Sequence, residues 1–187
     1  MAIEVIWEQL LGRGLEHLIL EQDGAVDANG IAVGMLEGTT YRIQYQVSCD
    51  ADWSVRQFRV RNLLNNEGVS LTRRGNDWLD EAGTAQAELA GCTEVDIMVT
   101  PFTNTLPIRR LKMQPGQAQQ ISVVYVSVPD LKVSKAEQVY TCIKASAEGG
   151  VFRYHSPSSG FTANLTVDAD QVVTDYAGIF RLVWKKG

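Results

Sequence analysis

The most regular feature of the sequence is an alternation of hydrophobic and polar positions between residues 40 and 49. Hydrophobic side chains occupy every second position and polar ones stand between them: Tyr41, Ile43, Tyr45 and Val47 against Arg42, Gln44, Gln46 and Ser48. A period of two places the two sets on opposite faces of a β-strand. Asp50-Ala51-Asp52 breaks the pattern and residues 53–61 resume it, which predicts an antiparallel pair of strands.

The polar face of this predicted pair has two interpretations. Its side chains are Arg42, Gln44, Gln46, Arg56 and Arg59. A face rich in basic and amide groups is typical of a sheet surface in water. On the concave side of a curved sheet, the same side chains would instead be placed to hold polar head groups. The pattern leaves both interpretations open, whereas it assigns the hydrophobic face to the core.

Shorter strand patterns recur about every 8–12 residues, with turn sequences such as Asn29-Gly30 between them. They predict strands at residues 15–21, 31–36, 69–73, 78–79, 95–100, 108–113, 119–128, 139–145, 151–155, 161–167 and 179–184. Residues 3–7 fit either a strand or the start of a short helix, and residues 81–89 fit at most two helical turns. Pro115-Gly116 predicts a turn that folds residues 108–113 back onto residues 119–128. We therefore predict an all-β fold with little helix, in a single domain spanning residues 1–187.

The composition excludes several classes of function. A net charge of -5 gives no electrostatic reason to bind nucleic acid. No window approaches the roughly 18 uninterrupted apolar residues of a membrane-spanning helix. The N-terminal residues lack the basic region and cleavage site of a signal peptide, so we expect a cytoplasmic location. Cys49, Cys92 and Cys142 are an odd number without metal-like spacing, which predicts buried, reduced thiols.

The segment 91–111 concentrates the unusual chemistry of the chain, reading Gly-Cys-Thr-Glu-Val-Asp-Ile-Met-Val-Thr-Pro-Phe-Thr-Asn-Thr-Leu-Pro-Ile-Arg-Arg-Leu. Alternation at its start separates two sets of side chains: Val95, Ile97 and Val99 on one face, Asp96, Met98 and Thr100 on the other. Pro101 and Pro107 lack backbone N–H groups, which predicts a sheet edge, a bulge or a loop there. Arg109 and Arg110 would point to opposite faces of a strand, so only one of them could pair with Asp96.

The residues Thr103, Asn104 and Thr105 between the two prolines have two interpretations. Their side chains can hydrogen-bond the local backbone and hold an irregular structural corner. With an arginine nearby, they also present the mixed donors and acceptors that a sugar or polar head group requires. The residues alone leave both open.

Catalytic patterns are weak throughout the chain. Cys92 has no local nucleophile signature, and His17 is expected to be a hydrogen-bonded structural side chain. Asp50 and Asp52 fit turn formers better than a pair of carboxylates facing each other across a sugar. No glycine-rich phosphate loop and no metal-ligand cluster is recognisable. We therefore predict a protein that is not an enzyme and that needs no cofactor and no metal.

The run at residues 100–111, with Gly91-Cys92 and Asp96-Ile97, resembles the bacterial family described as putative glycolipid-binding proteins. The resemblance extends over nearly the whole chain: Trp7, Gly14-Leu15-Glu16-His17, Tyr45, Cys49-Asp50-Ala51-Asp52-Trp53, Gly75-Asn76-Asp77-Trp78, Gln138-Val139-Tyr140, Tyr154, Phe161 and Val173-Thr174-Asp175-Tyr176. It implies an all-β domain whose large antiparallel sheet curls into an incomplete barrel, similar in shape to bacterial lipoprotein carriers. Those carriers act outside the inner membrane, whereas this chain shows no export signal.

The leading hypothesis is therefore non-enzymatic binding of a glycolipid or another amphipathic ligand with a fatty-acyl part, in the concavity of the curled sheet. The acyl chain would lie among some of Tyr41, Ile43, Tyr45, Trp53, Phe58 and Met98. The predicted ligand-binding residues are Tyr45, Trp53, Asp96, Thr100, Thr103, Asn104, Thr105, Arg109 and Arg110.

Two alternatives and one question stay open. The same aromatic side chains could fill a closed core, which would make the protein a structural or protein-interaction module without a ligand pocket. A hydrolase or isomerase acting on a lipid or sugar would require a polar pair with shifted pKa values inside a pocket. The sequence does not indicate the oligomeric state.

Overall fold

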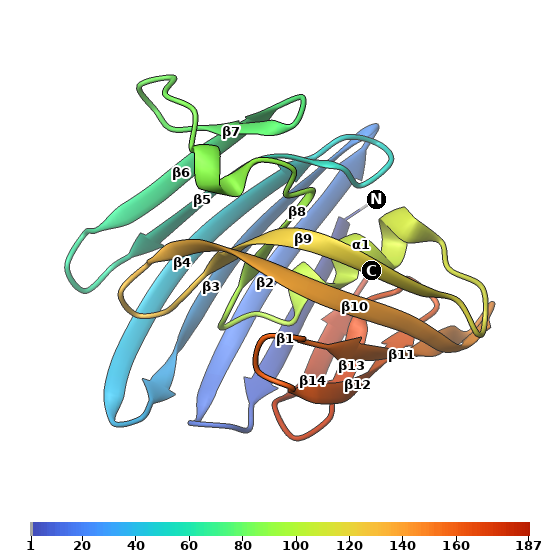
Figure 1. Cartoon of the computed structure of the whole chain (residues 1–187). Helices are drawn as coiled ribbons and strands as arrows, with labels where there is room; N and C mark the ends of the chain where they lie inside the picture. Colours follow the sequence, from blue (N-terminus) through green and yellow to red (C-terminus); the bar gives the residue numbers. More distant parts are fainter. Residues whose placement is uncertain (1) are drawn as a thin grey trace.

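A single 14-stranded sheet runs through the described part of the chain, residues 2–187 of a computed structural model. Its strand order is β7-β6-β5-β4-β3-β2-β1-β14-β13-β12-β11-β10-β9-β8. Neighbouring strands are antiparallel, and the pair β8–β9 at one edge is parallel. Figure 1 shows the strong curl of the sheet, which stays open. The predicted all-β fold, an antiparallel sheet curled into an incomplete barrel, is confirmed.

The elements follow one another along the chain with short connections. The strands are β1 (Ala2–Gln9), β2 (Gly14–Asp23), β3 (Ala25–Leu36), β4 (Thr39–Cys49), β5 (Val55–Asn62), β6 (Gly68–Arg74), β7 (Asp77–Leu79), β8 (Glu94–Ile97), β9 (Ala118–Val126), β10 (Val133–Ser146), β11 (Gly149–His155), β12 (Thr162–Asp168), β13 (Val173–Tyr176) and β14 (Phe180–Lys186). The helices are a single 3-10 turn, η1 (Ala87–Leu89), and the α-helix α1 (Phe102–Leu111). Residues 3–7 thus form a strand.

Strand β4 has the two faces that its alternation predicts. Tyr41, Ile43, Tyr45 and Val47 are buried, and the residues between them are exposed or nearly so. The ring of Tyr45 stacks on Phe102 of α1, with 6.3 Å between centroids, so the buried face is the inner face of the curl. The polar side chains therefore point outward into water. The interpretation that they line the concave side is wrong.

The segment after β8 folds as the helix α1 inside the curl, and not as a strand or a loop (Figure 1). Its first turn is held by Thr100, whose Oγ1 accepts a hydrogen bond from the Phe102 N–H at 3.0 Å. Pro107 lies within the helix although it cannot donate a backbone hydrogen bond. The residues from Phe102 to Ile108 are all buried, so the tertiary environment outweighs the local preference.

The predicted strand at residues 108–113 and its hairpin with residues 119–128 are consequently wrong. Residues 108–111 belong to α1, and Lys112 ends it in a left-handed conformation. Strand β9 pairs instead with β10 on one side and with β8 on the other. The chain thus passes from β8 through the interior before it returns to the sheet.

Two hydrophobic clusters fill the curl. The first joins the inner faces of β1–β7 to β8, α1 and part of β9, and the second joins β10–β14 to Ile108 of α1 and to the rest of β9. Five residues of the predicted acyl-binding surface are buried in the first cluster: Tyr41, Ile43, Tyr45, Trp53 and Phe58. The sixth, Met98, is 40% exposed. The half of the curl formed by β1–β5 is therefore a closed core at these positions, because α1 and β8 occupy its concavity.

Two minor predictions concern the cysteines and the membrane. Cys49, Cys92 and Cys142 are buried free thiols, as predicted. Neither helix within residues 2–187 has the length and apolar character to cross a membrane. Location in the cytoplasm stays a prediction, and so does the single domain at residues 1–187.

Glycines in β3 make room for the two buried tyrosines of β4. Gly30 lies opposite Tyr45 and Gly34 opposite Tyr41. A Cβ atom at Gly30 would lie 2.1 Å from Cζ of the Tyr45 ring, far inside van der Waals contact. The ring of Tyr45 therefore lies directly over the backbone of the neighbouring strand, which fixes where its hydroxyl group points.

Gly30→Ala is expected to destabilise the protein by about 1–3 kcal/mol, because the Tyr45 ring and its packing on α1 must shift. Urea unfolding monitored by tryptophan fluorescence measures this loss. Gly68→Ala is the matched control in β6, where the nearest atom would be 3.2 Å away. Equal stabilities of the two variants would contradict the packing role of Gly30.

Candidate functional site

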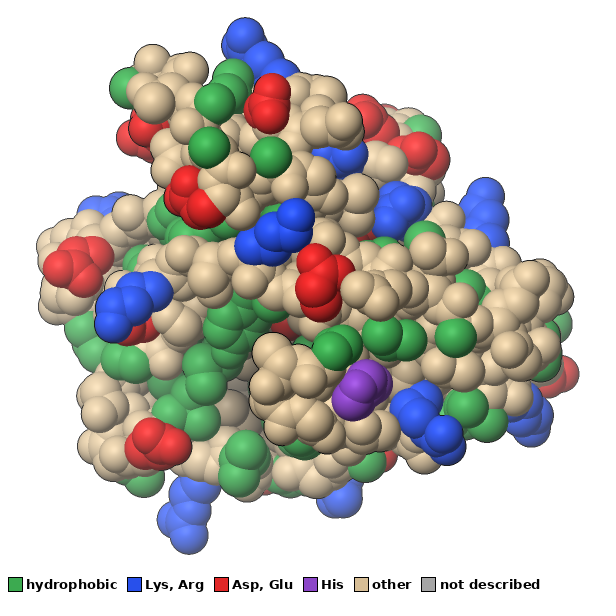
Figure 2. Space-filling view, in the orientation of Figure 1, with side chains coloured by type: hydrophobic (Ala, Val, Ile, Leu, Met, Phe, Trp, Pro, Cys, Tyr) green, Lys and Arg blue, Asp and Glu red, His purple; other side chains and the backbone are tan. Residues whose placement is uncertain are grey.

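A pocket of about 810 Å³ lies in the half of the curl that α1 does not fill. Its walls are β8 with the residues after it, the start of α1, β9, β10, the end of β11, the loop at residues 156–159, β13 and the start of β14. In Figure 2 hydrophobic side chains gather in a hollow beneath the β9–β10 ribbon. Three of the predicted ligand-binding residues line the pocket: Asp96, Thr100 and Asn104.

Asp96 is the acidic group at the centre of this site. Its Oδ1 accepts a hydrogen bond from Thr103 Oγ1 at 3.1 Å, and its Oδ2 accepts one from Gln138 Nε2 at 2.6 Å. Among residues 2–187 it forms no ion pair with a basic side chain. Loss of solvation raises the pKa of Asp96, and these two hydrogen bonds partly oppose the rise. The carboxyl group is thus held by neutral donors while it faces the pocket.

A chain of polar side chains connects Asp96 to α1. Asn104 Nδ2 donates to Tyr140 Oη at 2.8 Å, and Tyr140 Oη donates to Gln138 Oε1 at 3.3 Å. Gln138 in turn donates to Asp96. The helix, β10 and β8 are therefore fixed relative to one another by side chains, which sets the geometry of the pocket wall.

Aromatic rings form much of the remaining wall. Tyr154 lies 6.2 Å from Tyr176 and 6.0 Å from Phe161 between ring centroids, and Tyr176 lies 6.2 Å from Phe180. Strand pairing places Tyr125 directly beside Asp96. Burial raises the pKa of Tyr125, Tyr154 and Tyr176, and the negative charge of Asp96 adds to the rise in each. Asp96 is therefore surrounded by tyrosines from three strands.

Behind Thr100 lies a second carboxyl group, Glu16, which sequence reasoning missed. Glu16 Oε1 accepts hydrogen bonds from Thr100 Oγ1 at 2.6 Å and from Tyr45 Oη. Its Oε2 is buried without a hydrogen-bond partner in the described residues. Burial raises the pKa of Glu16 to about 8. Tyr45, a predicted ligand-binding residue, thus holds Glu16 inside the core and does not line the pocket.

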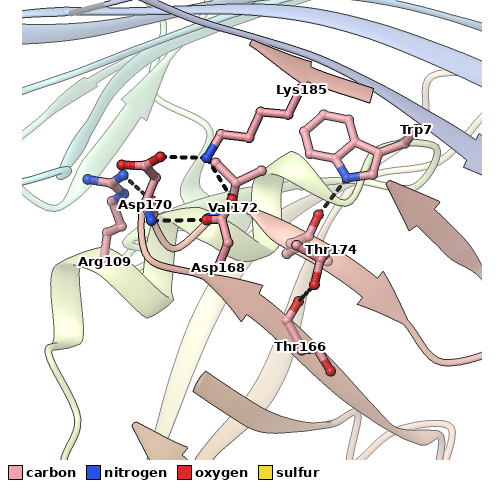
Figure 3. Close-up of polar contacts among 9 residues, drawn as sticks. Trp7, Arg109, Thr166, Asp168, Asp170, Val172, Thr174 and Lys185 are labelled. Atoms are coloured by element: carbon pink, nitrogen blue, oxygen red, sulfur yellow. Dashed lines mark hydrogen bonds and ion pairs between the residues drawn. The ribbon is translucent and has the colours of Figure 1, made fainter. Parts of the chain in front are cut away.

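Neither arginine of the central segment contacts Asp96, so the predicted pair is wrong. Arg110 instead forms an ion pair with the buried Glu94. The guanidinium group of Arg109 lies 4.3 Å from the ring centroid of Trp53. It also donates to the Asp170 carbonyl oxygen (Figure 3). The reason is that these residues are helical, so they leave α1 in directions that a strand pattern does not describe.

The other predicted residues have structural surroundings. Thr103 supports Asp96 from behind, and its Oγ1 also accepts a hydrogen bond from the Ile97 N–H at 3.3 Å. Thr105 is buried, and its Oγ1 has no hydrogen-bond partner in the part of the chain that the structure describes. Trp53 is buried beneath Arg109. The loop after β12 is fixed beside them by Lys185, which contacts Asp168 and Asp170 at 2.6 Å and 2.5 Å (Figure 3).

The segment that organises this site also identifies the protein's relatives. A family model described as putative glycolipid-binding matches residues 4–182. The chain belongs to this family. The resemblance carried by residues 100–111 and by positions along the chain is thereby confirmed, and the family description supports a binding role.

A solved structure of a DUF1089 family protein from Pseudomonas aeruginosa shares the fold of this family member. The two align with a TM-score of 0.76 at 32% sequence identity, over 90% of this chain and 91% of that chain. No match was found among curated proteins.

The Glu16 carboxyl group predicts a dependence of stability on pH. Its pKa rises from an ordinary value of 4.5 to about 8 on folding. The folded protein therefore binds this proton more tightly than the unfolded chain, and Glu16 makes the free energy of unfolding decrease as pH rises from about 4.5 to 8.

Glu16→Gln should remove that contribution, because an amide needs no proton to stay neutral. We expect it to raise the free energy of unfolding at pH 8 by about 2–4 kcal/mol and to have little effect at pH 4.5. Urea unfolding at both pH values gives the difference. Glu21→Gln, at an exposed position of the same strand, controls for the change in net charge. An equal effect of the two substitutions at both pH values would contradict the raised pKa of Glu16.

Arg110→Met should cost about 3–5 kcal/mol at pH 8, because it leaves Glu94 buried without its cation. The loss should shrink at pH 5, since burial raises the pKa of Glu94 to about 7 even beside Arg110, so the carboxyl group can protonate. Arg109→Met removes the contact with Trp53 and should cost about 1–2 kcal/mol, with no such pH dependence. Chemical unfolding of both variants is the measurement, and a reversed order of the two losses would contradict the assignment of partners.

Proposed function

We propose that the chain, acting as the single domain predicted at residues 1–187, binds a glycolipid or similar amphipathic ligand without transforming it. The observation that carries the proposal is the pocket beside α1, whose volume falls within the roughly 300–1,000 Å³ of small-molecule sites. The family description points to the same class of ligand. The closed-core alternative requires a protein without such a pocket, so the pocket counts against it.

The polar part of the pocket is suited to hydroxyl groups. A carboxylate oxygen can accept two hydrogen bonds, and each oxygen of Asp96 accepts one from the protein. Tyr125 and Tyr176 line the same pocket, so their hydroxyl groups can donate to a ligand or accept from it. The rings of Tyr154 and Phe161 supply flat surfaces against which a sugar ring can pack. The head group would therefore lie against Asp96 and these aromatic side chains.

The apolar part of the ligand would follow the hydrophobic side of the pocket. Met98 and Phe161 are each 40% exposed within it, and Ile179 adjoins them in the wall. The Leu10 N–H donates to the Ile179 carbonyl oxygen at 2.7 Å, which places the exposed residues Leu10 and Leu11 beside this end of the wall. An alkyl chain could thus leave the pocket along apolar atoms and not through water.

Binding of decyl glucoside below its micelle concentration, measured by isothermal titration calorimetry, tests this function. Affinity should rise from free glucose through octyl to decyl glucoside, because each added methylene group buries apolar surface. Met98→Gln should weaken decyl glucoside binding about tenfold, which corresponds to about 1.4 kcal/mol.

Leu15→Gln is the matched control, because Leu15 is 52% exposed on the outer face of β2. It should leave the affinity unchanged. The proposal fails if none of the alkyl glucosides binds, or if Leu15→Gln weakens binding as much as Met98→Gln.

A further inference from the structure

The charge of the pocket is the feature that distinguishes among amphipathic ligands. Two carboxyl groups, Asp96 and Glu137, line it together with Lys135, and the donors that hold Asp96 are neutral. The basic side chains nearby have other partners: Arg110 pairs with Glu94, Arg109 lies on Trp53, and Lys135 at the rim donates to the Ala90 carbonyl oxygen at 3.0 Å. The charge of Lys135 acts on its neighbour Glu137 at the exposed rim, so an anionic head group beside Asp96 would meet a carboxylate that has no paired cation.

The aromatic wall favours the opposite charge. Rings of Tyr154, Tyr176 and Phe161 lie within 6.5 Å of one another, measured between centroids. Ring faces carry a negative electrostatic potential and attract cations, most strongly when an ammonium group loses water. A carboxylate and several aromatic rings around one space are the combination by which proteins bind alkyl ammonium groups. A neutral hydroxyl group would contact the carboxylate but would not be attracted to the rings as a cation is.

We infer that the head group bound beside Asp96 carries a positively charged ammonium group, as an amino sugar or an alkyl ammonium amphiphile does, and that anionic head groups are excluded. The ammonium group would lie against the Asp96 carboxylate and beside the cluster of rings formed by Tyr154, Tyr176 and Phe161. The inference rests on the proposed function for the location of the ligand, and it adds the charge by which the ligand is selected.

The surroundings of Asp96 make this charge preference dependent on pH. Facing Asp96 are Thr103 and Asn104 from α1 and four tyrosines from the strands: Tyr125, Tyr140, Tyr154 and Tyr176. Burial raises the pKa of every one of these tyrosines, so none ionises below pH 8. At the rim, the hydrogen bond from Ser122 lowers the pKa of Glu137. Burial raises the pKa of Asp96, so this carboxyl group takes up its proton at a higher pH than an ordinary aspartate does.

Glu16 is the remaining titratable group near the pocket. It lies behind Thr100 and titrates at about pH 8. Measurements are therefore made at pH 7 and below, where Glu16 is mostly protonated.

Three probes with the same ten-carbon tail separate head-group charge from hydrophobic binding. They are decyltrimethylammonium, decyl glucoside and decanoate, each titrated into the full-length protein below its micelle concentration. Decyltrimethylammonium should bind about tenfold or more tightly than decyl glucoside at pH 7. Decanoate should bind more weakly than either. The affinity for decyltrimethylammonium should fall as pH decreases and Asp96 protonates, because the charge of this probe does not change with pH.

Asp96→Asn should abolish the preference, lowering decyltrimethylammonium affinity about tenfold while changing decyl glucoside affinity less than about threefold. Asp23→Asn, at an exposed position before the turn to β3, alters the net charge equally and should leave both affinities unchanged. The pH series on the unaltered protein supplies an independent readout if Asp96→Asn does not fold.

The outcomes separate the inference from the proposed function. Tighter binding of decyl glucoside than of decyltrimethylammonium overturns the ammonium preference and leaves glycolipid binding intact. Failure of all three probes to bind overturns both. A preference for decyltrimethylammonium that Asp96→Asn and low pH do not reduce shows that the aromatic rings or the overall charge cause it, which overturns the role of Asp96.

Discussion

The structure depends on one constraint: an open curled sheet has an apolar inner face that something must cover. In this protein the chain covers it with its own segment, β8 and α1. The helix is unusually polar for a buried element, since Thr103, Asn104 and Thr105 are all inside. Burial of polar groups is costly unless they are hydrogen-bonded, and side chains from β8 and β10 bond two of the three. Residues 103–105, for which the sequence allowed a structural corner, thus belong to a buried helix that plugs the interior of the curl.

The position of this plug determines where a ligand can bind. The helix and β8 close the half of the curl formed by β1–β7, where Tyr45 packs on Phe102. The polar side of the same segment turns toward β10–β14 and becomes a wall of the pocket. Asp96 therefore has two roles that depend on each other, because it accepts the hydrogen bond of Thr103 and also faces the pocket. A structural function and a binding function for this segment are compatible.

The sequence revealed elements whose two faces differ and concealed those buried on all sides. Strand β4 was predictable because water on one face selects polar residues at every second position. Helix α1 was not, because a helix surrounded by protein shows no amphipathic period and Pro107 argues against it. Because residues 108–113 were predicted as a strand, the directions of the Arg109 and Arg110 side chains were also predicted wrongly. Asp96, Thr100 and Asn104 were found from their chemistry, whereas Tyr125, Gln138 and Tyr176 reach the pocket only through long-range strand pairing. Glu16 was visible in the sequence as a charged residue in the inward-facing set of β2, two positions before Leu18.

The strand order places the two ends of the chain side by side at the middle of the sheet. Strand β14 is bonded to β1 on one side and to β13 on the other, so it joins the first hydrophobic cluster to the second. During synthesis β14 follows the other described strands, and until it is made the two halves share no backbone hydrogen bonds through it. Completion of the curl therefore has to wait for β14, and the pocket, whose wall includes Phe180 of β14, cannot be complete before that strand has been made.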